Sequence, residues 1–164
     1  MKIEVRSALG FGATALAAFD DALLKAGVAN YNLIRLSSVI PSGAKIVSSK
    51  KPNTLKALSD EFGWRLYAVY AVEQAAPGQS AWAGVGWIQR PDGRGLFVEH
   101  EGSQKAAVIR SIDLSLNQMK RSRRWPAGPN RKIVVGGSHR QLFSCALAVA
   151  AYQSQAWPES ESRR

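Results

Sequence analysis

Residues 30–41 are Asn-Tyr-Asn-Leu-Ile-Arg-Leu-Ser-Ser-Val-Ile-Pro, and they hold the most informative pattern in the chain. The aliphatic and β-branched side chains from Asn32 to Ile40 predict a strand, and Pro41 ends it. Ser37 and Ser38 are the unusual feature, because two adjacent hydroxyl groups stand near the end of an otherwise apolar strand. Taken alone, such a pair most simply marks the place where the strand ends and a loop begins.

The sequence on either side of this segment alternates strand and helix patterns joined by short connections. A strand is predicted from Lys2 to Leu9, followed by a helix from Ala15 to Ala26 with Thr14 as its N-cap and Gly27 at its C-terminal end. Strands at 64–74, 81–89, 96–100 and 131–135 are predicted, together with helices at 54–62, 103–124 and from Ser138 through Tyr152.

This pattern predicts one α/β or α+β domain spanning residues 1–164. Residues 91–95, Pro-Asp-Gly-Arg-Gly, are a strong turn signal and predict a hairpin between the strands on either side. Both faces of the 64–74 strand are largely apolar, as in a sheet that is covered on both sides. A layered architecture is therefore expected.

Composition excludes several classes of protein. The 164 residues are 46% hydrophobic, which is enough for a core, and one cysteine excludes an intramolecular disulfide scaffold. A reducing cytoplasm is the expected location. No apolar run approaches the roughly 20 residues of a membrane helix, so no membrane partner is expected.

The formal net charge of +10 would attract nucleic acid at low salt. Much of this charge stands in Lys120, Arg121, Arg123 and Arg124, at the end of the predicted long helix, and in the terminal Arg163 and Arg164. A solvated helix end that complements the helix dipole, plus a tail, explains these residues. A nucleic-acid partner is therefore not favoured.

Three other motifs have simpler structural explanations. Residues 10–15, Gly-Phe-Gly-Ala-Thr-Ala, resemble a dinucleotide-binding turn, but no acidic residue ends the next strand. Cys145 lies in an apolar segment that predicts an inert core thiol. His100 and His139 lack partners at metal-ligand spacing, so no metal site is predicted.

The serine segment gains meaning from its neighbours, because the chain resembles the pyruvoyl-dependent arginine decarboxylase family. The resemblance runs through residues 18–27, Ala-Phe-Asp-Asp-Ala-Leu-Leu-Lys-Ala-Gly, then 31–41, then 97–102, Phe-Val-Glu-His-Glu-Gly, and more loosely 134–152. It covers most of the chain in the family's order. Ser42, where many members have a second proline, and the positive charge are departures that do not touch the presumed chemistry.

The resemblance implies that the chain processes itself. The Ser38 hydroxyl would attack the carbonyl of Ser37, and the resulting ester would eliminate and hydrolyse to a pyruvoyl group on residue 38. The products would be chains 1–37 and 38–164. This reaction needs a serine nucleophile, a carbonyl within attack range and fixed donors for the developing oxyanion.

The same resemblance implies that the pyruvoyl cofactor forms a Schiff base with L-arginine and accepts electrons as carbon dioxide leaves, giving agmatine, a polyamine precursor. Glu99 matches the family's proton donor, with Glu101 as the competing acid, and Asn32 matches a residue near the reaction centre. Asp20 matches the guanidinium-binding carboxylate, and Leu16 and Leu23 on its helix would line the substrate's aliphatic part. Ser37, as the new carboxyl terminus, and Val39 would border the substrate.

The family's members are trimers of layered α-β-β-α subunits with active sites between subunits, so the resemblance implies a homotrimer or a dimer of trimers. Two alternatives stay open. The first keeps the pyruvoyl chemistry with another amino acid, because Asp20 alone fixes little about the pocket. The second is an unprocessed homologue or a basic binding module, for which the net charge is the only support.

Overall fold

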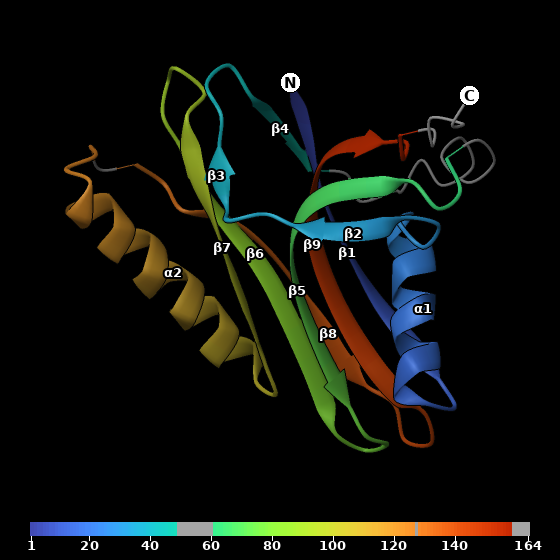
Figure 1. Cartoon of the computed structure of the whole chain (residues 1–164). Coiled ribbons are helices and arrows are strands. Elements are labelled where there is room, and N and C mark those ends of the chain that lie inside the picture. The colour runs from blue at the N-terminus through green and yellow to red at the C-terminus, as the bar shows by residue number, and fades with distance from the viewer. Residues whose placement is uncertain (49–60, 127, 159–164) are drawn as a thin grey trace, which may run out of the picture.

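The computed structural model describes residues 1–48, 61–126 and 128–158, which form two β-sheets and two α-helices (Figure 1). The strands and helices, in chain order, are β1 (Lys2–Gly12), α1 (Ala15–Ala26), β2 (Asn32–Arg35), β3 (Val39–Ile40), β4 (Lys45–Ser48), β5 (Arg65–Ala75), β6 (Ser80–Gln89), β7 (Gly95–Gly102), α2 (Lys105–Ser122), β8 (Arg131–Ser138) and β9 (Phe143–Gln155). This is a mixed, α+β fold.

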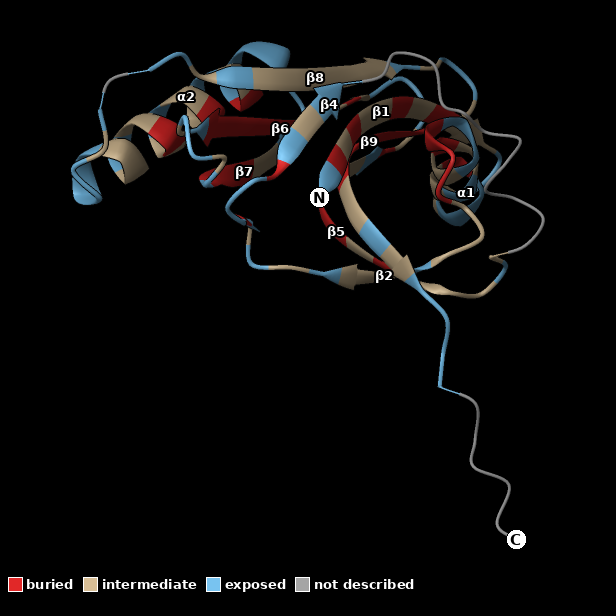
Figure 2. Ribbon diagram, turned by 90° about the horizontal axis from the view of Figure 1, so that it is seen from above, coloured by how far each residue is buried: buried red, intermediate tan, exposed pale blue. Residues whose placement is uncertain are grey.

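One sheet has five strands in the order β2-β5-β9-β1-β4, and the other has four in the order β3-β7-β6-β8. A cluster of buried apolar side chains that includes Val69 and Ala148 from the first sheet and Val85 and Phe97 from the second joins the two sheets. The helices contact other surfaces: α1 packs on β1 and β9, and α2 packs on β6 and β7. Figure 2 shows the two helices at opposite sides of the molecule.

Helix α1 has the predicted bounds and the predicted caps. The Thr14 side chain accepts a hydrogen bond from the Ala17 amide at 3.1 Å, and Gly27 ends the helix in the left-handed region at a φ of 71°. Its small buried residues Ala18 and Ala22 lie against β1. A Cβ on Gly10 would stand 2.2 Å from the Ala18 carbonyl oxygen, so this close approach explains the glycine-rich motif.

The predicted hairpin and most of the predicted strands are present. Strands β6 and β7 pair antiparallel around the 91–95 turn, with Gln89 opposite Gly95. Helix α2 lies within the predicted 103–124 segment and buries Val108, Ile112 and Leu116. The predicted helix at 54–62 lies almost wholly outside the described residues. Within the described part of the chain, neither helix has the length and apolar character to span a bilayer.

The final helix predicted from Ser138 through Tyr152 is wrong, because this segment is strand β9 and Ser138 ends strand β8. Strand β9 occupies the centre of the five-stranded sheet, where it pairs with β1 on one side and β5 on the other. Residues 144–150 are buried on both faces, so their apolar run has no polar alternation to distinguish a strand from a core helix (Figure 2). Their alanines add a local preference for helix that the sheet overrides.

The single strand predicted from Asn32 to Ile40 is also wrong. Residues 32–35 form β2 at the edge of the five-stranded sheet, and residues 39–40 form β3 at the edge of the four-stranded sheet. Residues 36–38 cross from one sheet to the other (Figure 1). Ser38 has a φ of 71°, which an extended strand does not allow, so the backbone turns there.

Candidate active site

The segment between β2 and β3 brings Ser37 and Ser38 to the point where the chain leaves one sheet and enters the other. Before the crossing, the Leu36 amide donates to the Ala68 carbonyl oxygen at 2.9 Å. After it, Val39 is the register partner of Leu96 in β7. Between these anchors, the Phe97 amide donates to the Ser38 carbonyl oxygen at 2.8 Å. The backbone is therefore held by the five-stranded sheet before Ser38 and by the four-stranded sheet from Ser38 onward.

The side chain of Ser38 contacts a carboxylate. Its hydroxyl donates a hydrogen bond to Oε1 of Glu99, which lies on β7 two residues after Phe97. Alternate residues of a strand face the same side, so Glu99 shares the face of Phe97, which is buried in the cluster between the sheets. Ser38 and Glu99 are both partly buried. A hydroxyl group and a carboxylate thus meet at the rim of the core.

Positive φ at Ser38 is a further distinctive feature of this site. Only Ser38 and Arg124 have positive φ among the non-glycine residues that the structure describes. A left-handed serine stores backbone strain, which persists only where the surrounding contacts hold it. At Ser38 those contacts are the Phe97 amide and the Glu99 carboxylate.

Tyr152 on β9 completes the surroundings of Ser38. Its hydroxyl donates to the Val39 carbonyl oxygen at 3.0 Å, and its ring meets the Phe97 ring edge-on, with 6.0 Å between centroids. Burial, and secondly the negative charge of Glu99, raise the pKa of the Tyr152 phenol. Sequence reasoning did not select Tyr152, and the only signal was the loose resemblance of residues 134–152, which ends at this residue.

Leu16, Asp20 and Leu23, which the sequence analysis predicts to bind substrate, lie on α1, away from Ser38. Their helix packs on β1 and β9, whereas Ser38 and Glu99 are placed by β3 and β7 of the other sheet. Leu16 is 74% exposed, Asp20 is exposed and Leu23 is half-buried. One copy of the chain therefore does not bring these three residues to the serine.

Asp21, next to Asp20, has a structural role instead. It accepts hydrogen bonds from the Phe11 amide at 2.7 Å and from Lys25 Nζ at 2.6 Å. These two donors hold the pKa of the Asp21 carboxyl below its usual value, against an opposing effect of burial that is individually the largest. In the described residues no hydrogen bond or ion pair to Asp20 is present, so of the two aspartates only Asp21 makes such contacts.

Asn32 and Val39 are placed at the two ends of the segment. Asn32 is the first residue of β2, and its side-chain amide donates to the Gly63 carbonyl oxygen at 2.6 Å. Val39, directly after Ser38, is 59% exposed although it is apolar. Ser37 is exposed as well. The structure thus leaves Ser37 and Val39 on the surface beside Ser38, and Asn32 six residues before it.

The other polar residues that the sequence analysis considered have separate surroundings. His100 Nε2 lies 2.8 Å from the Ser115 hydroxyl oxygen on α2. Cys145 is fully buried in β9, and burial raises the pKa of its thiol to about 11. Glu101 is exposed, and its charge adds to the effect of burial in raising the pKa of Glu73. The described residues contain no group of three metal-ligating side chains.

Comparison with known proteins confirms the family resemblance. The sequence model of the pyruvoyl-dependent arginine decarboxylase family matches residues 2–156. This chain belongs to the pyruvoyl-dependent arginine decarboxylase family. In this family member, the match includes both strands that hold Ser38, as well as Glu99 and Tyr152.

Individual relatives carry the name of the same family. A pyruvoyl-dependent arginine decarboxylase of Thermococcus kodakarensis is 35% identical over 128 residues, which is 76% of each chain. Those of Halobacterium salinarum and Pyrococcus abyssi are 41% identical over 99 residues and 40% identical over 104 residues. These two matches cover 60% and 62% of this chain, and 59% and 61% of the relatives' own length.

Proposed function

We propose that this member of the pyruvoyl-dependent arginine decarboxylase family is a self-processing enzyme that converts L-arginine to agmatine and carbon dioxide. The observation that carries the proposal is the contact between the Ser38 hydroxyl and the Glu99 carboxylate at the crossing between the sheets. The family name and the names of the relatives support arginine as the substrate and a pyruvoyl group as the cofactor.

The residues at the crossing fit the formation of a pyruvoyl group from Ser38. In the proposed reaction, Ser38 Oγ attacks the carbonyl carbon of Ser37, and the peptide bond between them is replaced by an ester. Elimination at residue 38 then releases the carboxyl group of Ser37, and water displaces ammonia to leave the pyruvoyl group. The strained backbone of Ser38 and the contacts that hold it support this assignment.

Glu99 has two proposed tasks at this site. Before processing it holds the Ser38 hydroxyl. Afterwards it lies beside residue 38 and supplies the proton that replaces the departing carboxyl group, which is general acid catalysis. A pyruvoyl group supplies the electron sink that decarboxylation of an amino acid requires. The Tyr152 hydroxyl, through the Val39 carbonyl, keeps the backbone after residue 38 in place.

Substrate recognition is proposed to use residues from two copies of the chain. Asp20 offers a carboxylate to the guanidinium group, and Leu16 and Leu23 line the aliphatic part of the substrate. Because α1 and Ser38 lie apart within one copy of the chain, the complete site needs α1 of a neighbouring copy. The exposed apolar side chains Leu16 and Val39 support such an interface. Asn32 is also exposed, and it is proposed to reach the reaction centre of a neighbouring copy.

The proposed assembly is a homotrimer or a dimer of trimers. Each chain would contribute an α-β-β-α sandwich, because the two sheets share a core and the helices pack on the outer surface of each sheet. The single, buried cysteine suits a reducing cytoplasm, which is the proposed location.

The first experiment is an intact-mass spectrum of the purified, denatured protein. Two fragments that divide between Ser37 and Ser38, with the longer one lacking its free amino group, are expected. A single full-length mass would contradict self-processing and favour an unprocessed homologue. The substrate is then tested by comparing arginine with lysine, ornithine, histidine and aspartate, and a faster reaction with another amino acid would contradict arginine as the substrate.

A further inference from the structure

A cavity lies away from the crossing between the two sheets, at the C-terminal end of α2. It is a cavity of about 430 Å³ between the end of β6, the turn after it, the segment after α2 and the start of β8. This volume falls within the usual range for small-molecule sites. We call it the α2 cavity and define it by Trp87, Arg90, Lys120, Trp125, Pro129 and Arg131.

The α2 cavity is separate from Ser38 and Glu99. Its lining includes Ile88, which packs with Leu96, Val98 and the buried face of α2. Phe97, on the same side of β7 as Glu99, belongs instead to the cluster between the two sheets. A ligand in the α2 cavity would therefore bind on the opposite side of the four-stranded sheet from the catalytic pair.

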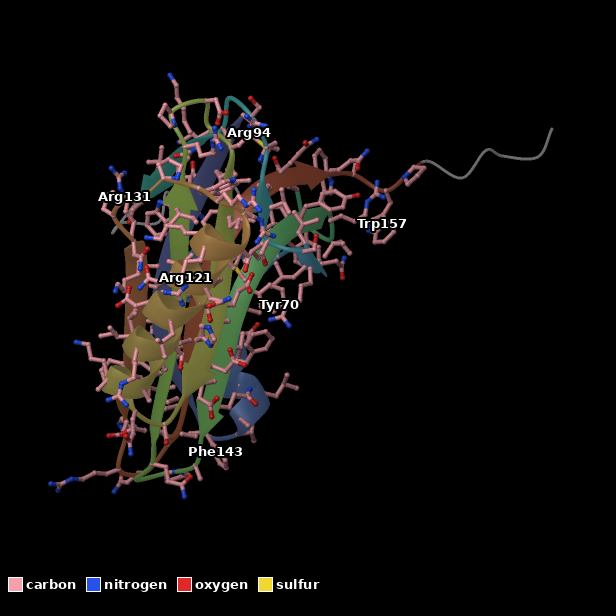
Figure 3. The ribbon with its side chains drawn as sticks, turned by 90° about the vertical axis from the view of Figure 1, so that its left-hand side faces the viewer. Tyr70, Arg94, Arg121, Arg131, Phe143 and Trp157 are labelled. Atoms are coloured by element: carbon pink, nitrogen blue, oxygen red, sulfur yellow. The ribbon has the colours of Figure 1, made fainter. Side chains whose placement is uncertain are left out.

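The charge around the α2 cavity is positive. Arg90, Lys120 and Arg131 line it, and the lining residues include no acidic side chain. Two aspartates lie nearby: Asp92 pairs most closely with Arg94, at 2.6 Å, and also with Arg90, and Asp113 pairs with Lys132. Arg121, Arg123 and Arg124, at the end of α2, are all exposed and add to the basic surroundings. Figure 3 shows Arg94 and Arg131 toward one end of the molecule, with Phe143 at the other.

One nitrogen donor at this cavity has no hydrogen-bond partner in the described residues. It is Nε of Arg90, and the atom is buried. Arg90 Nε lies 3.7 Å from an Asp92 oxygen, which is an ion pair but too long for a hydrogen bond. Buried donors are normally satisfied, so an unpaired one beside a basic cavity favours a ligand that accepts hydrogen bonds.

The other walls are flat and apolar. The Arg90 guanidinium lies 5.6 Å from the centre of the Trp125 ring, and prolines 91, 126 and 129 also line the cavity. Lys120 Nζ donates to the Gly128 carbonyl oxygen at 2.9 Å, which ties the end of α2 to the segment that follows. A tryptophan face beside cationic groups suits a planar ring that carries an anionic group.

We propose that the α2 cavity binds a nucleoside phosphate, with its base against Trp125 and its phosphate between Lys120, Arg90 and Arg131. The base supplies the planar ring, and the phosphate supplies the negative charge and the hydrogen-bond acceptors. This site does not depend on the proposed decarboxylation, because none of its lining residues takes part in that reaction.

The test is calorimetric titration of the purified full chain with AMP at physiological salt, where weak charge effects are screened. AMP is expected to bind with a Kd below 1 mM, and at least tenfold more tightly than adenosine or inorganic phosphate. No binding of AMP at 1 mM overturns the proposal. Equal affinity for inorganic phosphate overturns the role of the base, and equal affinity for adenosine overturns the role of the phosphate.

Matched variants distinguish AMP binding in the α2 cavity from general electrostatic attraction to a basic protein. Arg131→Gln is expected to weaken AMP binding at least tenfold, whereas Arg110→Gln, which removes an exposed charge from the same α2 helix outside the cavity, is expected to change it less than twofold. Equal effects overturn the assignment. Trp125→Leu is expected to weaken the binding of AMP at least tenfold and to leave the binding of inorganic phosphate unchanged.

Circular dichroism verifies that each variant is folded, and Lys120→Gln replaces any variant that is not. A Lys120→Gln protein that binds AMP as tightly as the original chain also overturns the proposal. Binding of a single-stranded oligonucleotide without binding of AMP would move the assignment from a small molecule to nucleic acid and overturn the proposal as stated.

Discussion

The hydroxyl of Ser38 donates its hydrogen bond to the carboxylate of Glu99, which lies 61 residues later in the chain. The two residues meet because the chain crosses from the edge of one sheet to the edge of the other immediately before β3, and β3 pairs with the beginning of β7. The contact joins the residue proposed as the source of the cofactor to the residue proposed as the proton donor.

Replacing Ser38 with alanine tests the source of the cofactor. Ser38→Ala removes the attacking hydroxyl, so we expect one uncut and inactive chain in the intact-mass spectrum. Ser37→Ala is the matched control, because it keeps the Ser37 carbonyl that is attacked, and it should still divide. An uncut Ser37→Ala protein, or a divided Ser38→Ala protein, would contradict the assigned roles.

Replacing Glu99 with glutamine separates processing from catalysis. The amide oxygen of glutamine still accepts the Ser38 hydrogen bond, but the amide does not supply an acidic proton. We therefore expect Glu99→Gln to divide into two fragments while kcat falls about 100-fold or more, the usual size of a general acid's contribution. Glu101→Gln, at an exposed position two residues further along β7, should retain most of the activity. A larger fall in kcat in Glu101→Gln than in Glu99→Gln would assign the proton donor to Glu101.

Tyr152→Phe tests the hydrogen bond that holds the backbone after Ser38. The substitution keeps the ring against Phe97 and removes only the hydroxyl bound to the Val39 carbonyl oxygen. We expect a loss of about 1 kcal/mol in the free energy of unfolding, measured on an unprocessed Ser38→Ala background. In the chain that retains Ser38, division should be slower. Tyr67→Phe, whose hydroxyl donates to Gln155 on an exposed surface, is the control and should leave the rate of division unchanged.

Asp20→Asn tests substrate recognition. Because Asp20 is exposed and its neighbour Asp21 makes the structural contacts, we expect the KM for arginine to rise at least tenfold with little change in thermal stability. Asp21→Asn should instead lower stability, because it weakens the ion pair with Lys25. An unchanged KM in Asp20→Asn would remove its assigned role.

The buried thiol of Cys145 predicts a pH dependence of stability. Burial raises its pKa from 9.0 to about 11, so the folded chain holds this proton more tightly than the unfolded chain does. This stabilisation is complete below pH 9 and is lost as the pH rises through about 11. Between pH 8 and pH 11, the unfolding free energy should fall about 1–3 kcal/mol further in the original chain than in Cys145→Ala. Parallel curves would contradict the prediction.

Local sequence signals predicted several elements of this fold correctly, for identifiable reasons. Thr14 and Gly27 bracket α1 because capping depends on a few neighbouring residues. The Pro-Asp-Gly-Arg-Gly turn predicted the β6–β7 hairpin because turn chemistry is equally local. The burial of Cys145 followed from its apolar neighbours. Family resemblance then selected Ser38 and Glu99 as a pair, and the structure brings them into contact.

Residues 143–155 and 32–40 needed the tertiary structure. In β9 the apolar run is continuous because the other sheet covers one face of the strand and α1 covers the other. A strand buried on both faces has no alternation of polar and apolar residues, so the sequence pattern does not distinguish it from a helix. Division of residues 32–40 between β2 and β3 depends on which strands they meet, β5 and β7, and not on their own side chains. Tyr152 reaches the site through the same long-range pairing.

The amino-acid sequence by itself therefore determined the helix α1, the hairpin, the inert cysteine and the serine pair, because each depends on residues adjacent in the chain. Only the tertiary structure decided that Ser38 turns with positive φ between two sheets, that Glu99 faces it, and that Asp20 lies on a helix away from both. Contacts between residues far apart in the chain depend on sheet order and layer packing, which no local pattern encodes.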